Sequence, residues 1–145
     1  MSSAHSTPPA LLDLSTYLLS RIGKAARGRL ADRLAERGLR LWDMAVLAAL
    51  SDFGPHAQRD LVVRLGVDPS DMAKVVDQLA TGGYVERARG RRRPAAGRDL
   101  LAELDAEARA LQDELLAPLD PEERTRLQGL LLRVHQGLGE RPYAP

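Results

Sequence analysis

The sequence predicts a mainly α-helical fold: a winged helix-turn-helix core, flanked by long N- and C-terminal helices, with a shortened or incomplete β wing. Three observations support this prediction. Leucine, alanine and arginine abound, while Val, Ile and Thr form no alternating runs, and this composition favours helix over sheet. Apolar residues recur at helical spacing near both ends of the chain,. Between them, residues 65–93 read as helix, glycine turn, short strand and arginine cluster,.

The length of 145 residues suits one domain with a real core,. We expect a disordered tail over residues 1–8 and a single domain over residues 9–145. Within it, residues 9–40 and 97–140 would form dimerisation helices. Residues 41–96 would form the winged helix-turn-helix lobe.

The first predicted helix starts at Pro9, where proline is tolerated, and runs until Gly38 stops it,. Its apolar stripe is Leu11, Leu14, Leu18, Ile22, Ala26, Leu30 and Leu34. A second helix over Leu41–Phe53 is apolar around most of its circumference, which is typical of a core helix,. A short third helix over Gln58–Leu65 ends at the turn residue Gly66,.

Residues 67–80 form the candidate recognition helix. Asp68 can cap the free amides of its first turn, and Pro69 can occupy the first helical position,. The residues expected to face inward are Met72, Val75, Val76 and Leu79,. Those expected to face outward are Ser70, Asp71, Ala73, Lys74 and Asp77.

After Gly82 and Gly83, residues 84–87 are the one convincing strand,. The basic residues of the predicted wing are Arg87, Arg89, Arg91, Arg92 and Arg93. Residues 84–98 carry six Arg against one Glu, so basic charge gathers where a wing would lie,. The alternative is an ordinary solvated face. The cluster runs directly into Pro94 and a new helix, without a strand that would return the wing.

The C-terminal part is predicted to be helical over residues 96–116 and again after Asp120, where acids favour a helix start,. Long amphipathic helices at both ends carry more apolar surface than one small core covers, which indicates pairing with a second copy. Intramolecular packing alone is the alternative. The residues expected at a dimer interface are Leu11, Leu14, Leu18, Leu127, Leu130, Leu131, Val134 and Leu138.

Several classes of function find no support in the residues. The chain has no cysteine, which excludes a disulfide framework, a thiolate zinc site and a thiol nucleophile,. His5, His56 and His135 lie far apart, and no nucleophile motif or phosphate-binding glycine loop is present,. We therefore predict no enzyme activity, no metal site and no cofactor. No apolar run is long enough to span a membrane, and no signal peptide is evident, so we expect a cytoplasmic protein,.

Three phrases of the sequence, GLRLWDMAVLAAL, LVVRLGVDPSDMAKVVDQLATGGYVER and AAGRDLLAEL, resemble the MarR family of bacterial transcription regulators, whose pattern spans residues 11–138. The resemblance implies a homodimer that places two winged helices on double-stranded DNA at a palindromic operator, usually as a repressor. It also implies release by a small aromatic or phenolic ligand between the dimer helices and the DNA-binding lobe. Tyr17 and Trp42 would border such a cleft, although an apolar Trp at helical spacing is more often core.

The sequence departs from the family in the wing. Family members continue past the first strand into a turn and a second strand with alternating apolar residues, whereas here GRRR meets PAAGRDLL directly. The tip and the return strand are therefore not expected to form in the usual way. Either the wing is shortened, or the sequence lacks a segment.

On the DNA hypothesis, Ser70, Asp71, Ala73 and Lys74 would meet base edges. Residues 42–83 hold six acids against three bases, so the attraction to phosphates must come largely from the wing arginines. Gln58 and Arg59 would assist at the DNA backbone. The alternative is a dimeric interaction module of the same family, with DNA binding weakened by the curtailed wing.

Overall fold

The computed structural model describes residues 6–88, 90–94 and 96–139. The elements are α1 (Pro9–Leu12), α2 (Ser15–Ala35), α3 (Leu41–Phe53), α4 (Gln58–Leu65), α5 (Pro69–Thr81), β1 (Val85–Ala88), β2 (Arg91–Pro94), α6 (Gly97–Leu115) and α7 (Pro121–Gly137). Of the tail predicted to be disordered, residues 1–5 lie outside the described residues. The mainly α fold with a short wing is confirmed.

The single N-terminal helix predicted from Pro9 to Gly38 is wrong in one respect, because the structure divides it. α1 ends at Leu12, and Leu14 adopts an extended conformation (φ −99°, ψ 113°) before α2 begins. Asp13 and Ser15 flank this corner, and both residue types compete with helix through local hydrogen bonds to the backbone. The apolar spacing continues across the break, which is why the pattern alone does not reveal it.

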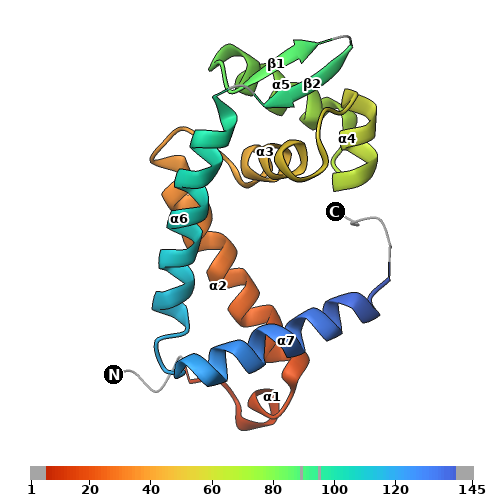
Figure 1. Ribbon diagram of the computed structural model, residues 1–145. Helices are drawn as coiled ribbons and strands as arrows, with labels where there is room; N and C mark the ends of the chain where they lie inside the picture. The colour runs from red at the N-terminus through yellow and green to blue at the C-terminus, as the bar shows by residue number, and fades with distance from the viewer. Residues whose placement is uncertain (1–5, 89, 95, 140–145) are drawn as a thin grey trace.

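The helices α3, α4 and α5 form a lobe at the top of Figure 1 together with both strands, and its core extends to Leu34 of α2 and to Leu100 and Leu104 of α6. The four residues predicted to face inward on α5 are all at most 3% exposed. Burial of such an apolar stripe is the main stabilising contribution available to a helix of this length. The buried residues of the main hydrophobic cluster are Leu34, Val46, Leu47, Ala49, Leu50, Leu61, Val67, Met72, Val75, Val76, Leu79, Val85, Leu100 and Leu104.

The long helices α2 and α6 descend from this lobe toward α7, which crosses the lower part of Figure 1. α6 can begin close to the lobe because its first residue is Gly97. A Cβ atom at this position would lie 2.5 Å from the Tyr84 carbonyl oxygen and 2.6 Å from Cδ2 of Leu47. Only glycine permits this approach.

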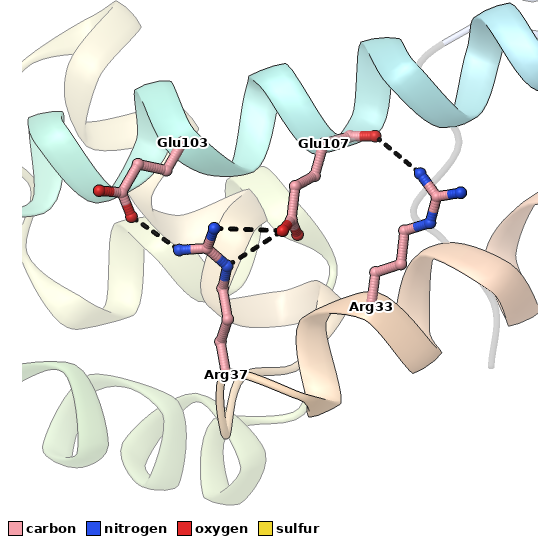
Figure 2. A network of polar contacts seen from close by, with 4 residues as sticks. All are labelled: Arg33, Arg37, Glu103 and Glu107. Carbon is pink, nitrogen blue, oxygen red and sulfur yellow. Dashed lines mark hydrogen bonds and ion pairs between the residues drawn. The ribbon is translucent and has the colours of Figure 1, made fainter.

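Two arginines near the C-terminal end of α2 join it to α6 (Figure 2). Arg37 bonds to Glu103 through Nη1 at 2.7 Å and to Glu107 through Nε and Nη2 at 3.2 and 3.1 Å. Arg33 reaches the Glu107 carbonyl at 3.5 Å and the Glu114 carboxylate at 2.6 Å. A network of charge-assisted hydrogen bonds thus ties α2 to α6.

The wing is an antiparallel hairpin in which Val85 pairs with Pro94, Glu86 with Arg93, Arg87 with Arg92, and Ala88 with Arg91. The prediction of a shortened wing is confirmed, but the expectation that no return strand forms is wrong. A two-residue connection joins the strands, and Gly90 supplies the positive φ of 76° that such tight hairpins need,. The three arginines themselves form the return strand.

The strand β2 is also held from its other side. The His56 amide donates to the Arg92 carbonyl at 2.9 Å, and the Arg92 amide donates to the His56 carbonyl at 2.6 Å. This isolated bridge satisfies backbone groups that an edge strand would expose,. Within the described residues, no helix is long and apolar enough to cross a membrane.

Candidate nucleic-acid interface

The outward face of α5 is assembled as the sequence predicts. Ser70, Asp71 and Lys74 are exposed, and Ala73 is half-buried. The helix starts at a well-formed cap, because the Asp68 carboxylate accepts from the Ser70 amide at 2.8 Å and from the Ser70 hydroxyl at 2.5 Å. These bonds to Ser70 are the main reason that the pKa of Asp68 lies below its ordinary value,. The first turn of α5 is therefore capped and polar.

The wing presents a pair of like charges. Arg87 and Arg92 are direct cross-strand partners, so their side chains share one face of the hairpin,. Arg87 is exposed and Arg92 is half-buried. Neither makes an ion pair with any acid in the part of the chain that the structure describes. Like charges placed directly opposite each other repel, and a bound anion such as a phosphate would relieve this repulsion.

The other predicted DNA contacts fall on the same lobe. Gln58 and Arg59 occupy the first turn of α4, and Arg59 is exposed. Arg91 is exposed at the start of β2, and Arg93 pairs with Glu86 through the strand backbone. Arg89 lies outside the described residues. The structure thus gathers α4, α5 and the wing into one lobe, and the role of each residue in binding stays a prediction.

Sequence reasoning missed a cluster that supports the wing. His56, to which the sequence analysis assigns no structural role, is only 8% exposed. Its Nδ1 lies 2.6 Å from the Gly54 carbonyl, and its Nε2 accepts a 3.0 Å bond from Nε of Arg64. The Arg64 guanidinium also lies 4.0 Å from the centre of the Phe53 ring,. A histidine beside Gly-Pro gave no periodic signal that would have revealed this contact.

The two residues predicted to border a ligand cleft lie apart in one chain. Tyr17 is near the start of α2, and Trp42 follows the opposite end of that helix, so about 27 Å of helix separates Tyr17 from the α2 terminus,. Trp42 packs against the core of the lobe. A cleft that contains both residues would need a second chain.

A cavity of about 410 Å³ lies instead where α2, α3 and α5 meet, and its lining includes Arg37, Asp43, Asp77 and Tyr84. Asp43 is 1% exposed, and its carboxylate accepts from the Arg40 amide at 2.7 Å. Burial raises the pKa of Asp43, and its Oδ1 has no partner in the described structure. Neither Tyr17 nor Trp42 lines this cavity.

The residues predicted at a dimer interface form an apolar surface on α1, α2 and α7. α7 buries none of its residues within the described chain, and Leu130, Val134 and Leu138 are 55%, 57% and 67% exposed. Leu14, Leu18 and Leu131 are also exposed, while Leu11 and Leu127 are half-buried. Further exposed apolar residues that the prediction did not include are Leu12, Leu19, Ile22 and Leu132.

Comparison with known proteins extends this description. The model of the MarR family matches residues 37–98, which include the whole wing and the three helices of the lobe. A MarR family protein of Mycobacterium tuberculosis in complex with DNA is 26% identical, with a TM-score of 0.76 over 89% of this chain and 98% of the other. The same mycobacterial protein in complex with salicylic acid is 27% identical, with a TM-score of 0.68 over 83% and 98%.

A third similar structure is CouR of Rhodococcus jostii RHA1 bound to p-coumaroyl-CoA. It is 25% identical, with a TM-score of 0.71 over 95% of this chain and all of the other. No curated protein matches the sequence. Among the described residues, no group of three or more His, Asp or Glu side chains is placed to hold a metal ion.

Proposed function

Because the chain belongs to the MarR family, we propose that it is a sequence-specific DNA-binding regulator of transcription that acts as a repressor. The observation that carries this proposal is the pair of arginines, Arg87 and Arg92, which lie opposite each other on a short wing whose strand β1 contacts α5. A relative of the same fold has a structure in complex with DNA. Residues 41–96 would be the DNA-binding lobe of a single domain over residues 9–145.

The outward face of α5 and the wing would contribute differently to DNA binding. The outward face of α5 has Lys74 as its one cation and Asp71 and Asp77 as acids, so it contributes little attraction to phosphates,. The wing arginines supply that attraction, which is independent of sequence. The first turn of α5 would then contact base edges in the major groove.

The functional form would be a homodimer on a palindromic operator. The exposed leucines of α7 and the exposed apolar residues of α1 and α2 would form the interface that a second copy covers. A two-fold axis would place two lobes on two half-sites.

A small aromatic or phenolic ligand would weaken DNA binding. Two of the similar structures hold salicylic acid and p-coumaroyl-CoA. Tyr17 of one chain would reach a ligand cleft beside Trp42 only across the dimer. A cytoplasmic location fits this role.

The alternative is an interaction module of the same family, with DNA binding weakened by the curtailed wing. The wing is short, but its return strand β2 pairs with β1 and bridges to His56, which favours DNA binding. Nothing else in the described chain favours the interaction module over DNA binding.

The experiment is fluorescence anisotropy of a labelled DNA fragment from upstream of the protein's own gene, across a salt series, with mass measured by light scattering. We expect a dimer whose affinity falls steeply with salt and exceeds its affinity for a scrambled fragment. Failure to bind at low salt while the protein remains folded and dimeric would overturn the proposal.

A further inference from the structure

The first turn of α5 presents hydrogen-bond acceptors in place of donors. The Ser70 hydroxyl lies 2.5 Å from Oδ1 of Asp68, which also accepts from the Ser70 amide. An ionised carboxylate carries no proton to donate, so the hydroxyl proton must point toward Asp68. Ser70 Oγ therefore offers only lone pairs to its surroundings.

The next residue, Asp71, also presents only hydrogen-bond acceptors. Asp71 is exposed, and its carboxylate makes no hydrogen bond or ion pair with any residue that the structure describes. A carboxylate is an acceptor only. Ser70 and Asp71 thus form an adjacent pair of acceptors, and the first exposed donor further along the helix is Lys74.

The four bases differ in what they offer such a pair. In the major groove, cytosine presents the N4 amino donor, and adenine presents the N6 amino donor beside the N7 acceptor. Guanine and thymine present acceptors, O6 with N7 and O4 respectively, which repel an acceptor. A carboxylate favours cytosine over adenine because adenine N7 faces it with a further lone pair.

We propose that Ser70 and Asp71 determine sequence preference by accepting hydrogen bonds from base amino groups, with Asp71 selecting cytosine and Ser70 selecting cytosine or adenine at a neighbouring position. This inference rests on the proposed function and adds the chemistry of the half-site. Asp68 is a positioning residue in it, since it fixes the Ser70 hydroxyl as an acceptor.

The test is selection from a library of random duplexes, followed by competition with single-base variants of the selected site. For the wild type we expect one cytosine in each half-site that no other base replaces. Asp71→Asn changes this preference, because an asparagine amide can bond to both N6 and N7 of adenine. The cytosine-to-adenine affinity ratio at that position should fall by about tenfold or more.

Matched variants separate base reading from charge and stability. Asp77→Asn removes the same charge from α5, but residue 77 is six positions further along and about 120° around the helix from residue 71. It should raise overall affinity without changing the base preference. Ser70→Ala should weaken the preference for cytosine or adenine at the neighbouring base position. Ser70→Thr, which keeps a hydroxyl, should restore that preference.

The outcomes distinguish this inference from the proposed function. Failure of the wild type to bind any DNA would overturn both. Binding with an unchanged preference in Asp71→Asn, or binding without any sequence preference, would overturn this inference alone.

Discussion

Nε of Arg64 donates a 3.0 Å hydrogen bond to Nε2 of His56, and this contact fixes the ring as an acceptor on that side. Nδ1 then carries the ring proton and donates to the Gly54 carbonyl at 2.6 Å,. The backbone of the same residue bridges to Arg92 in the wing. His56 therefore links α4, the loop before it and β2 through one buried side chain and its own peptide groups.

The first prediction concerns this link. His56→Ala leaves the Arg64 donor and the Gly54 carbonyl without their partner, so we expect the free energy of unfolding to fall by about 1–3 kcal/mol. Urea denaturation measures it. His135→Ala, on the exposed face of α7, is the matched control and should change stability by less than about 0.5 kcal/mol. Equal effects of the two substitutions would contradict the role given to His56.

The second prediction concerns the start of α6. In Gly97→Ala the new methyl group would meet the Tyr84 carbonyl and the Leu47 side chain at about 2.5 Å, so we expect a loss of about 1–3 kcal/mol. Gly28→Ala, where a Cβ meets nothing within 4 Å, should instead stabilise α2 by about 0.5–1 kcal/mol. Thermal unfolding of both variants gives the comparison, and a neutral Gly97→Ala would refute the close approach.

The third prediction is a pH dependence. The hydrogen bond from Arg33 is the main cause that lowers the pKa of Glu114 below its ordinary value of 4.5. A carboxyl with a lowered folded pKa stabilises the fold above its ordinary pKa, and this contribution is lost as pH falls through the folded value. In Glu114→Gln, the melting temperature should therefore decline less than in the wild type as pH falls below 4.5. Identical pH profiles would show that the ion pair does not stabilise the fold.

The fourth prediction tests the dimer. Leu130 and Val134 are four residues apart on α7, so they share one exposed apolar face,. The double variant Leu130→Glu/Val134→Glu should place four charges in a two-fold interface and shift the mass from dimer to monomer in light scattering. Gln128→Glu, an exposed polar position on the same helix, should remain a dimer. A monomeric wild type would contradict the proposed assembly.

The helix α5, the candidate recognition helix, was predictable because local signals agree there with the tertiary structure. Asp68 and Pro69 mark its start, the glycines from Gly82 mark its end, and the apolar stripe is buried as the spacing requires. The outward face follows from the same periodicity. The break at Leu14 escaped prediction because the apolar spacing continues across it.

The return strand of the wing was not predictable from periodicity. Its residues are arginines followed by Pro94, with no alternating apolar pattern. It forms because Gly90 allows a tight turn and because His56, more than thirty residues earlier in the sequence, bridges to Arg92. A contact between residues so far apart in the sequence produces no local sequence pattern from which the strand could be predicted.

The most direct test of the account measures how DNA binding by Arg87→Ala/Arg92→Ala depends on salt, by anisotropy on the same fragment as the wild type. If these arginines contact phosphates, a dimer loses four contacts, and the slope of log affinity against log salt should become shallower by about 3–4. The control Arg29→Ala/Arg109→Ala removes two exposed arginines from α2 and α6 and should keep the wild-type slope. An unchanged slope in the wing variant would contradict the claim that this short hairpin binds DNA.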